Sequence, residues 1–257
     1  MARRRHSSRR HRRRGGNTGF LYKLLSVLAI CAAVVVALTL FFRVNHIQVE
    51  GAERYSVKEV RAATGVKKGD NLILMNKPTV VRDLQEKLPY VESVRISRKL
   101  PDTLVIELEE CSDPLGIVQG DSVWLISPRG KGKIVDQRPA EEAGNYALID
   151  GCELLAPSVG TPLALATEYA AQQENLLKLV HALSEAKMLQ EVDAIHLEDL
   201  SVLRMDYAGR FHVELPYGAD FPYKLRALNL VIEKLETNQT GTIQMLREDG
   251  RINFIED

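Results

Sequence analysis

The stretch Leu88–Glu110, LPYVESVRISRKLPDTLVIELEE, contains two segments in which apolar and polar residues alternate. Alternation with a period of two is typical of strands that bury one face. Leu100-Pro101-Asp102 interrupts the alternation and is a turn signal. The stretch therefore predicts two antiparallel strands. The residues expected on their buried face are Val94, Ile96, Leu104, Ile106 and Leu108.

The residues before this stretch supply the rest of a small domain. VNHIQVEG, from residue 44, reads as a short strand that ends at Gly51. In YSVKEVRAATG, Ser56 and Glu59 have the spacing of a capping box at a helix start. KPTVVRDLQEKLP, from residue 77, reads as a second helix that Pro89 ends. The order β-α-α-β-β predicts an α+β fold, a three-stranded sheet with two helices on one face.

An apolar segment, Phe20–Phe42, precedes this domain and carries no charge from Leu24 to Phe42. Nineteen helical residues at ~1.5 Å each span a hydrocarbon core of ~30 Å. A cleaved signal peptide is the alternative, but the segment ends in the bulky residues Leu40-Phe41-Phe42 instead of the small residues that cleavage requires. We therefore expect residues 20–42 to form an uncleaved transmembrane helix.

The net charge of zero hides a strong asymmetry along the chain. Residues 1–23 hold eight Arg, one Lys and no acid, so the rest of the chain has 25 basic against 34 acidic residues. Positive flanks of a membrane helix stay in the cytoplasm. We expect residues 1–19 to be a basic cytoplasmic tail and everything after residue 42 to lie outside. Nucleic-acid binding by the tail is the alternative, although the tail has no aromatic residue to stack on bases.

Five short motifs in order resemble the POTRA domain of the bacterial division proteins FtsQ and DivIB. They are I-x-V-x-G at residue 47, YS-x-x-E-V at 55, G-V-x-x-G-x-N-L at 65, LP-x-V-x-x-V-x-I-x-R at 88 and LP-D-T-L-x-I-x-x-x-E at 100. The resemblance implies a POTRA domain over residues 43–112 and a type II membrane protein at the division septum. It also implies a non-enzymatic role in cell division.

Residues 113–257 predict a second α+β domain, similar to the β-domain of the same family in element order. Short strands are expected around Ile117, Val123, Leu125 and Ile134, and residues 137–162 read mostly as loop. A long helix is expected over residues 163–188 and a second amphipathic helix from Phe221. Further strands are expected at 192–197, 203–207 and 211–215, followed by a closing hairpin that turns at Asp249-Gly250.

The residues contain no pattern that indicates catalysis, a metal or a cofactor. His46, His181, His196 and His212 lack ligand spacing, and GVKKGDN lacks the following G-K-[ST] of a phosphate-binding loop. Cys111 and Cys152 can pair only if the fold brings them together, and two unpaired thiols are favoured. A membrane-anchored cell-wall enzyme and a POTRA-bearing outer-membrane assembly factor remain as alternatives. The second needs many more amphipathic strands than this chain offers.

The hypothesis for binding is strand addition at the end of the chain. A terminal strand often lies at a sheet edge, whose unpaired N–H and C=O groups accept another strand. The resemblance implies that FtsL and FtsB, or DivIC in Gram-positive bacteria, bind through the end of the second domain; weak self-association stays open. Each side chain involved can equally be a core residue. The predicted partner-binding residues are Ile243, Gln244, Met245, Leu246, Arg251, Ile252, Asn253, Phe254 and Ile255.

Overall fold

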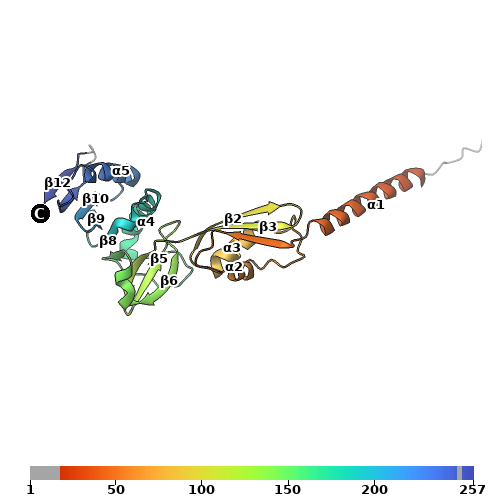
Figure 1. The fold of residues 1–257 in the computed structure, drawn as a ribbon, viewed down its shortest axis with the longest axis horizontal. Helices are drawn as coiled ribbons and strands as arrows, with labels where there is room; N and C mark the ends of the chain where they lie inside the picture. Colours follow the sequence, from red (N-terminus) through yellow and green to blue (C-terminus); the bar gives the residue numbers. More distant parts are fainter. Residues whose placement is uncertain (1–17, 248–250) are drawn as a thin grey trace, which may run out of the picture.

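The structure, a computed structural model, describes residues 18–247 and 251–257 (Figure 1). An apolar helix, a three-stranded domain and a larger nine-stranded sheet follow one another in a row, and the C-terminus lies at the end away from the helix (Figure 1). Most of the predicted basic tail, residues 1–17, lies outside the described residues.

The first helix, α1 (Thr18–Phe41), projects away from both domains. Its stretch Phe20–Phe41 is long and apolar enough to cross a membrane, and none of its most apolar window is buried against the rest of the chain. A helix that is apolar all round requires an apolar surrounding. The expected transmembrane segment therefore coincides with a free-standing helix.

The first domain has the predicted order β1 (His46–Glu50), α2 (Val57–Ala63), α3 (Lys77–Lys87), β2 (Val91–Lys99), β3 (Thr103–Glu110). Strand β3 lies in the middle of the sheet, parallel to β1 and antiparallel to β2. The capping box is present, since Ser56 and Glu59 each accept a hydrogen bond from the other's backbone N–H. The α+β fold is confirmed. Its buried core is Val44, Val60, Ala63, Leu72, Val80, Leu84, Leu88, Val91, Ile96, Leu104, Ile106 and Leu108.

The second domain is built on one nine-stranded sheet of order β12-β11-β10-β9-β8-β7-β4-β5-β6. Its strands are β4 (Leu115–Gln119), β5 (Ser122–Ile126), β6 (Ile134–Pro139), β7 (Leu148–Asp150), β8 (Val192–His196), β9 (Val202–Tyr207), β10 (Phe211–Pro216), β11 (Gly241–Gln244) and β12 (Asn253–Glu256). The sequence missed one element of this domain and placed the start of another wrongly. Residues 137–162 contain β7, which joins the two halves of the sheet by pairing in parallel with β4 and β8. The long helix, α4 (Ala170–Glu185), begins seven residues later than expected.

The two differences have separate physical reasons. Three residues are too few to show a period of two, so β7 has no local signal. Leu163 and Leu165 belong to an extended segment buried in the core, where Leu165 forms a bridge with Leu154. Their spacing therefore reflects a loop packed on the core.

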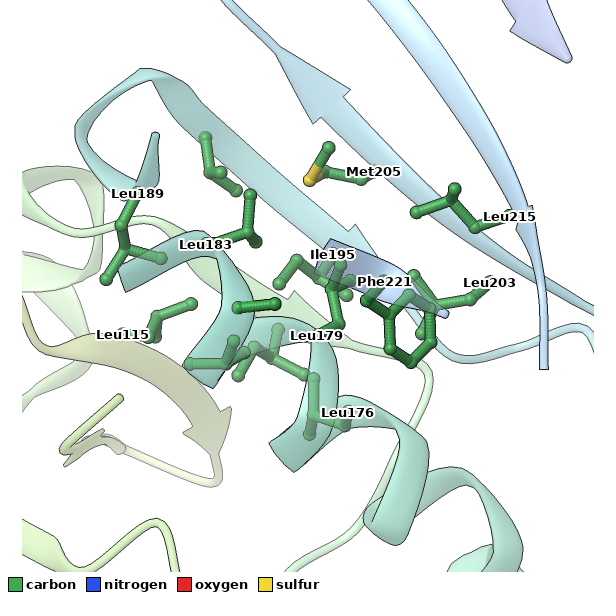
Figure 2. Close-up of a cluster of buried hydrophobic side chains, with 14 of the residues drawn as sticks. Leu115, Leu176, Leu179, Leu183, Leu189, Ile195, Leu203, Met205, Leu215 and Phe221 are labelled. Carbon is green, nitrogen blue, oxygen red and sulfur yellow. The ribbon is translucent and has the colours of Figure 1, made fainter. Parts of the chain in front are cut away.

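Helices α4 and α5 (Phe221–Ile232) each bury one apolar face in the core of the second domain. Figure 2 shows leucines of α4 directed at the side chains of strands β8, β9 and β10. Burying apolar surface contributes about 25 cal/mol per Å² removed from water, and this contribution is the main one that stabilises the domain. The labelled core residues are Leu115, Leu176, Leu179, Leu183, Leu189, Ile195, Leu203, Met205, Leu215 and Phe221.

The two domains contact each other through a small mixed junction. Tyr90 packs with Cys111 and strands β5 and β6, and its hydroxyl donates to Asp136 Oδ2 at 2.9 Å. The Glu92 carboxylate, 6% exposed, accepts from the Ser127 hydroxyl and lies 3.4 Å from Arg129 Nε. Burial raises the pKa of the Cys111 thiol to about 12, and Cys111 and Cys152 do not pair. The chain passes from the first sheet to the second between Glu110, where β3 ends, and Leu115, where β4 begins. The domain boundary at residues 112 and 113 stays a prediction.

Candidate partner-binding edge

Strand β12 forms one edge of the nine-stranded sheet, at the end of the molecule away from α1 (Figure 1). It pairs antiparallel with β11, so that Gly241 lies opposite Glu256 and Gln244 opposite Asn253. On its other side no strand pairs with it among residues 18–247 and 251–257. The terminal strand therefore has the position that strand addition requires.

The register tells which backbone groups of β12 point away from the sheet. The Asp257 N–H donates to the Thr240 carbonyl at 3.2 Å, and the Ile255 carbonyl oxygen lies against Gly241. In an antiparallel pair, residues alternate between those that bond to the neighbouring strand and those that do not. Ile255 and Asp257 therefore direct their backbone groups to β11. Phe254 and Glu256 direct theirs outward, where an added strand would lie.

The side chains of the predicted residues divide between the core and the surface. Ile243 and Met245 are fully buried. Phe254 is half-buried and packs edge-to-face on Phe211, with ring centroids 6.2 Å apart. Ile255 is 53% exposed. A partner would thus contact the backbone of β12 and its exposed side chains, while the buried residues hold the strand in place.

The remaining predicted residues lie around the hairpin. Gln244 donates to Glu214 Oε2 at 3.1 Å, and Leu246 is 37% exposed. Arg251 and the half-buried Ile252 precede β12, which starts at Asn253, two residues later than predicted. The turn expected at Asp249-Gly250 lies outside the described residues. Whether these residues bind a partner stays a prediction.

One residue that supports the hairpin was not predicted from the sequence. Lys224 of α5 is 7% exposed, and its Nζ donates to the carbonyls of Met245 at 2.8 Å and Arg247 at 2.7 Å. Both carbonyls lie where the chain leaves β11. The signal was present, because Lys224 lies three residues after Phe221 and four before Leu228, within the apolar stripe of the helix. A lysine in such a stripe needs a specific buried partner.

The first domain's two sheet edges are occupied by side chains. On β2, Lys77 Nζ donates to the Ile96 carbonyl at 2.8 Å and Gln85 Nε2 to the Glu92 carbonyl at 3.1 Å. On β1, the Arg61 guanidinium donates to the Ile47 carbonyl. Such contacts block pairing with another strand.

The edge of the second sheet at β6 is also partly covered. Ile134 exchanges hydrogen bonds with the segment Gly160–Thr161, both at 2.8 Å. By contrast, no described residue donates to, or accepts from, the outward backbone groups of Phe254 and Glu256. The edge at β12 is therefore the most open of the four in the described part of the chain.

A row of titratable side chains crosses the face of the second sheet that α4 and α5 leave open. His196 of β8 lies between Asp150 Oδ1 at 2.7 Å and Asp206 Oδ2 at 3.1 Å, and His212 Nδ1 lies 2.6 Å from Asp206 Oδ1. Partial burial disfavours the charged imidazolium, but the bonds to Asp206 and Asp150 outweigh it and raise the pKa of His196. Partial burial of Asp206 is likewise outweighed by its two histidine partners, and its pKa is lowered.

A second polar row lies beside the first and reaches the candidate edge. Arg204 Nε lies 3.4 Å from Glu214 Oε1, and Gln244 of β11 donates to the other oxygen of the same carboxylate. Paired cross-strand residues of this kind stabilise a solvated sheet face. In residues 18–247 and 251–257, no group of three or more His, Cys, Asp or Glu side chains is placed to hold a metal ion.

Comparison with known proteins identifies the first domain and relates the whole chain to named proteins. Residues 42–110 match the family described as POTRA domain, FtsQ-type. The chain is 26% identical to the cell division protein FtsQ of Corynebacterium glutamicum over 175 residues. These aligned residues are 68% of this chain and 77% of the relative. It is 26% identical over 228 residues to the cell division protein DivIB of Clostridium acetobutylicum, 84% of each chain. FtsQ of Syntrophotalea carbinolica is 25% identical over 200 residues, 77% of this chain and 67% of the relative.

The fold and the matched family define the class: an α+β protein with an FtsQ-type POTRA domain behind one apolar helix. Beyond that domain, the chain is similar over most of its length, at 25–26% identity, to cell division proteins named FtsQ and DivIB. The resemblance seen in the five sequence motifs is thereby confirmed.

Proposed function

We propose that the protein is a non-enzymatic scaffold of the bacterial division machinery, anchored in the cytoplasmic membrane by α1. Three observations support this. The stretch Phe20–Phe41 can cross a membrane, the Arg-rich residues 1–14 precede it, and the relatives are named cell division proteins. Because positive flanks stay inside, the N-terminus is cytoplasmic and both domains lie outside. The site of action is the division septum.

The open backbone edge of β12 is the observation on which the binding proposal rests. Partners of the FtsL and FtsB or DivIC type add a strand there. Main-chain hydrogen bonds from Phe254 and Glu256 supply affinity, and the exposed Ile255 and Asn253 contribute contacts beside them. The edge lies at the end of the molecule opposite α1 (Figure 1), so a bound strand would sit away from the membrane surface.

Proline substitution at an outward-facing position tests this idea. Glu256→Pro removes an outward N–H and leaves the bonds from Ile255 and Asp257 to β11 in place. Glu256→Ala is the matched control, because it removes the same side chain and keeps the donor. Affinity of the full-length chain in detergent for an FtsL–FtsB or FtsL–DivIC complex is measured for each variant.

We expect Glu256→Pro to weaken binding about tenfold, from one lost hydrogen bond and the steric bulk of the ring, and Glu256→Ala to bind nearly as the wild type does. A folded Glu256→Pro variant with unchanged affinity would show that this edge is not the docking site. Equal losses in both variants would assign binding to the side chain instead of the backbone.

A further inference from the structure

The first domain is fastened directly to the end of α1 by a loop that the sequence places 30 residues further on. The Asn71 side-chain amide donates to the Thr39 carbonyl at 3.2 Å, in the last turn of α1. The Leu72 N–H donates to the Phe42 carbonyl at 2.8 Å, and the Val44 N–H donates to the Asp70 carbonyl at 2.8 Å. The last carbonyls of a helix have no hydrogen-bond partner within the helix. Asn71 provides the partner for one of them, the carbonyl of Thr39.

The same asparagine positions two exposed apolar side chains. Its Oδ1 accepts hydrogen bonds from the backbone N–H groups of Ile73 at 2.8 Å and Leu74 at 2.9 Å. Ile73 is 46% exposed and Leu74 75% exposed. Because Asn71 bonds to Thr39 as well, these two side chains are held at the level where α1 ends.

A third apolar side chain comes from the turn between β2 and β3, which lies on the side of the domain that faces α1 (Figure 1). Leu100 in this turn is 58% exposed. The Asp102 carbonyl accepts from the N–H groups of Asn45 at 2.9 Å and His46 at 3.3 Å. The turn is thereby tied to the chain segment that leaves the helix.

The charges around these side chains favour an anionic surface. Arg43, Lys67 and Lys68 are exposed in the same loops, and Lys99 is exposed at the end of β2. The acids there are engaged locally, since Asp70 Oδ2 accepts from the Lys67 N–H and Asp102 accepts from Asn45. Apolar residues that enter a bilayer interface beside basic residues that meet anionic headgroups are the usual elements of peripheral membrane contact.

We propose that Ile73, Leu74 and Leu100, with the four basic residues around them, form a bilayer-contacting surface that seats the first domain on the outer leaflet. The proposal rests on the proposed membrane anchoring by α1. It goes further, because the domain would contact the membrane through Ile73 and Leu74 and through Leu100, in addition to its covalent link to α1. The orientation of the β12 edge relative to the membrane would then be restricted as well.

Single-tryptophan variants of the full-length chain test the contact. In a Trp124→Phe background, Leu74→Trp reports on the proposed surface. Leu200→Trp, at a side chain 76% exposed in the second domain, is the matched control. Val35→Trp reports on insertion of α1. Each variant is reconstituted in vesicles of phosphatidylethanolamine and phosphatidylglycerol, with and without bromine on the acyl chains, and its emission is compared.

We expect brominated lipid to quench Val35→Trp and Leu74→Trp, the latter with blue-shifted emission, and to leave Leu200→Trp unchanged. Adding Ile73→Ser and Leu100→Ser to the Leu74→Trp variant should reduce its quenching. Quenching of Val35→Trp alone would overturn the contact surface and leave the anchor intact. Absence of quenching in Val35→Trp would overturn both proposals.

Discussion

The buried lysine behind the candidate edge allows a quantitative test of how the hairpin is held. Lys224→Met keeps the length of the side chain and removes the ammonium that donates to the Met245 and Arg247 carbonyls. The Met245 carbonyl then becomes a buried acceptor without a partner, which costs about 1–3 kcal/mol. Arg247 is exposed, so water can satisfy its carbonyl. Part of this cost is offset, because the variant no longer has to desolvate a buried ammonium group.

We therefore expect the hairpin β11–β12 to lose about 2 kcal/mol of local stability, roughly a 30-fold larger opening equilibrium. Hydrogen exchange followed by mass spectrometry measures this in peptides that cover 241–247 and 251–257. Peptides from β2 should exchange as in the wild type.

Lys178→Met is the matched control for the loss of a lysine. Its Nζ makes a surface ion pair with Glu174 at 2.7 Å, one turn earlier in α4, and such pairs contribute under about 1 kcal/mol. Wild-type exchange at the hairpin in Lys224→Met would refute the supporting role of this residue. Faster exchange throughout the second domain would show that Lys224 stabilises the whole domain and has no particular role at the edge.

Two further predictions concern the domain junction and the polar face. Tyr90→Phe removes the hydroxyl that bonds to Asp136 and should lower the free energy of unfolding by about 1 kcal/mol, measured by denaturant unfolding with Trp124 fluorescence; an unchanged midpoint would contradict it. His196 has a raised pKa, so its bonds to two aspartates stabilise the fold fully below about pH 6.5, and this contribution is lost as the pH rises through the folded-state pKa. The stability difference between wild type and His196→Asn, from thermal unfolding in detergent, should be larger at about pH 5.5 than at about pH 9, and the opposite trend would disprove the assignment.

The elements with a strong local signal were predicted correctly because their cause is local. The capping box at Ser56 satisfies helix donors within four residues of chain. The alternation around Ile96 and Ile106 expresses one buried face of each strand. The candidate edge was predicted only as a position, because a terminal strand often lies outermost. Which of its residues face outward depends on register with β11, which alternation in a single strand does not contain.

Local pattern sufficed for the apolar helix, the β-α-α-β-β order of the first domain and the general α+β character of the second. Tertiary contacts decided the rest. They set the central place of β7, the occupied edges at β1 and β2, the hydrogen bonds from Lys224 to the hairpin and the hydrogen bond from Asn71 to the end of α1. Periodicity reports how one segment meets its surroundings. It does not report which distant segment provides them, and three of these features join residues 21 to 32 positions apart or strands that are not neighbours in the chain.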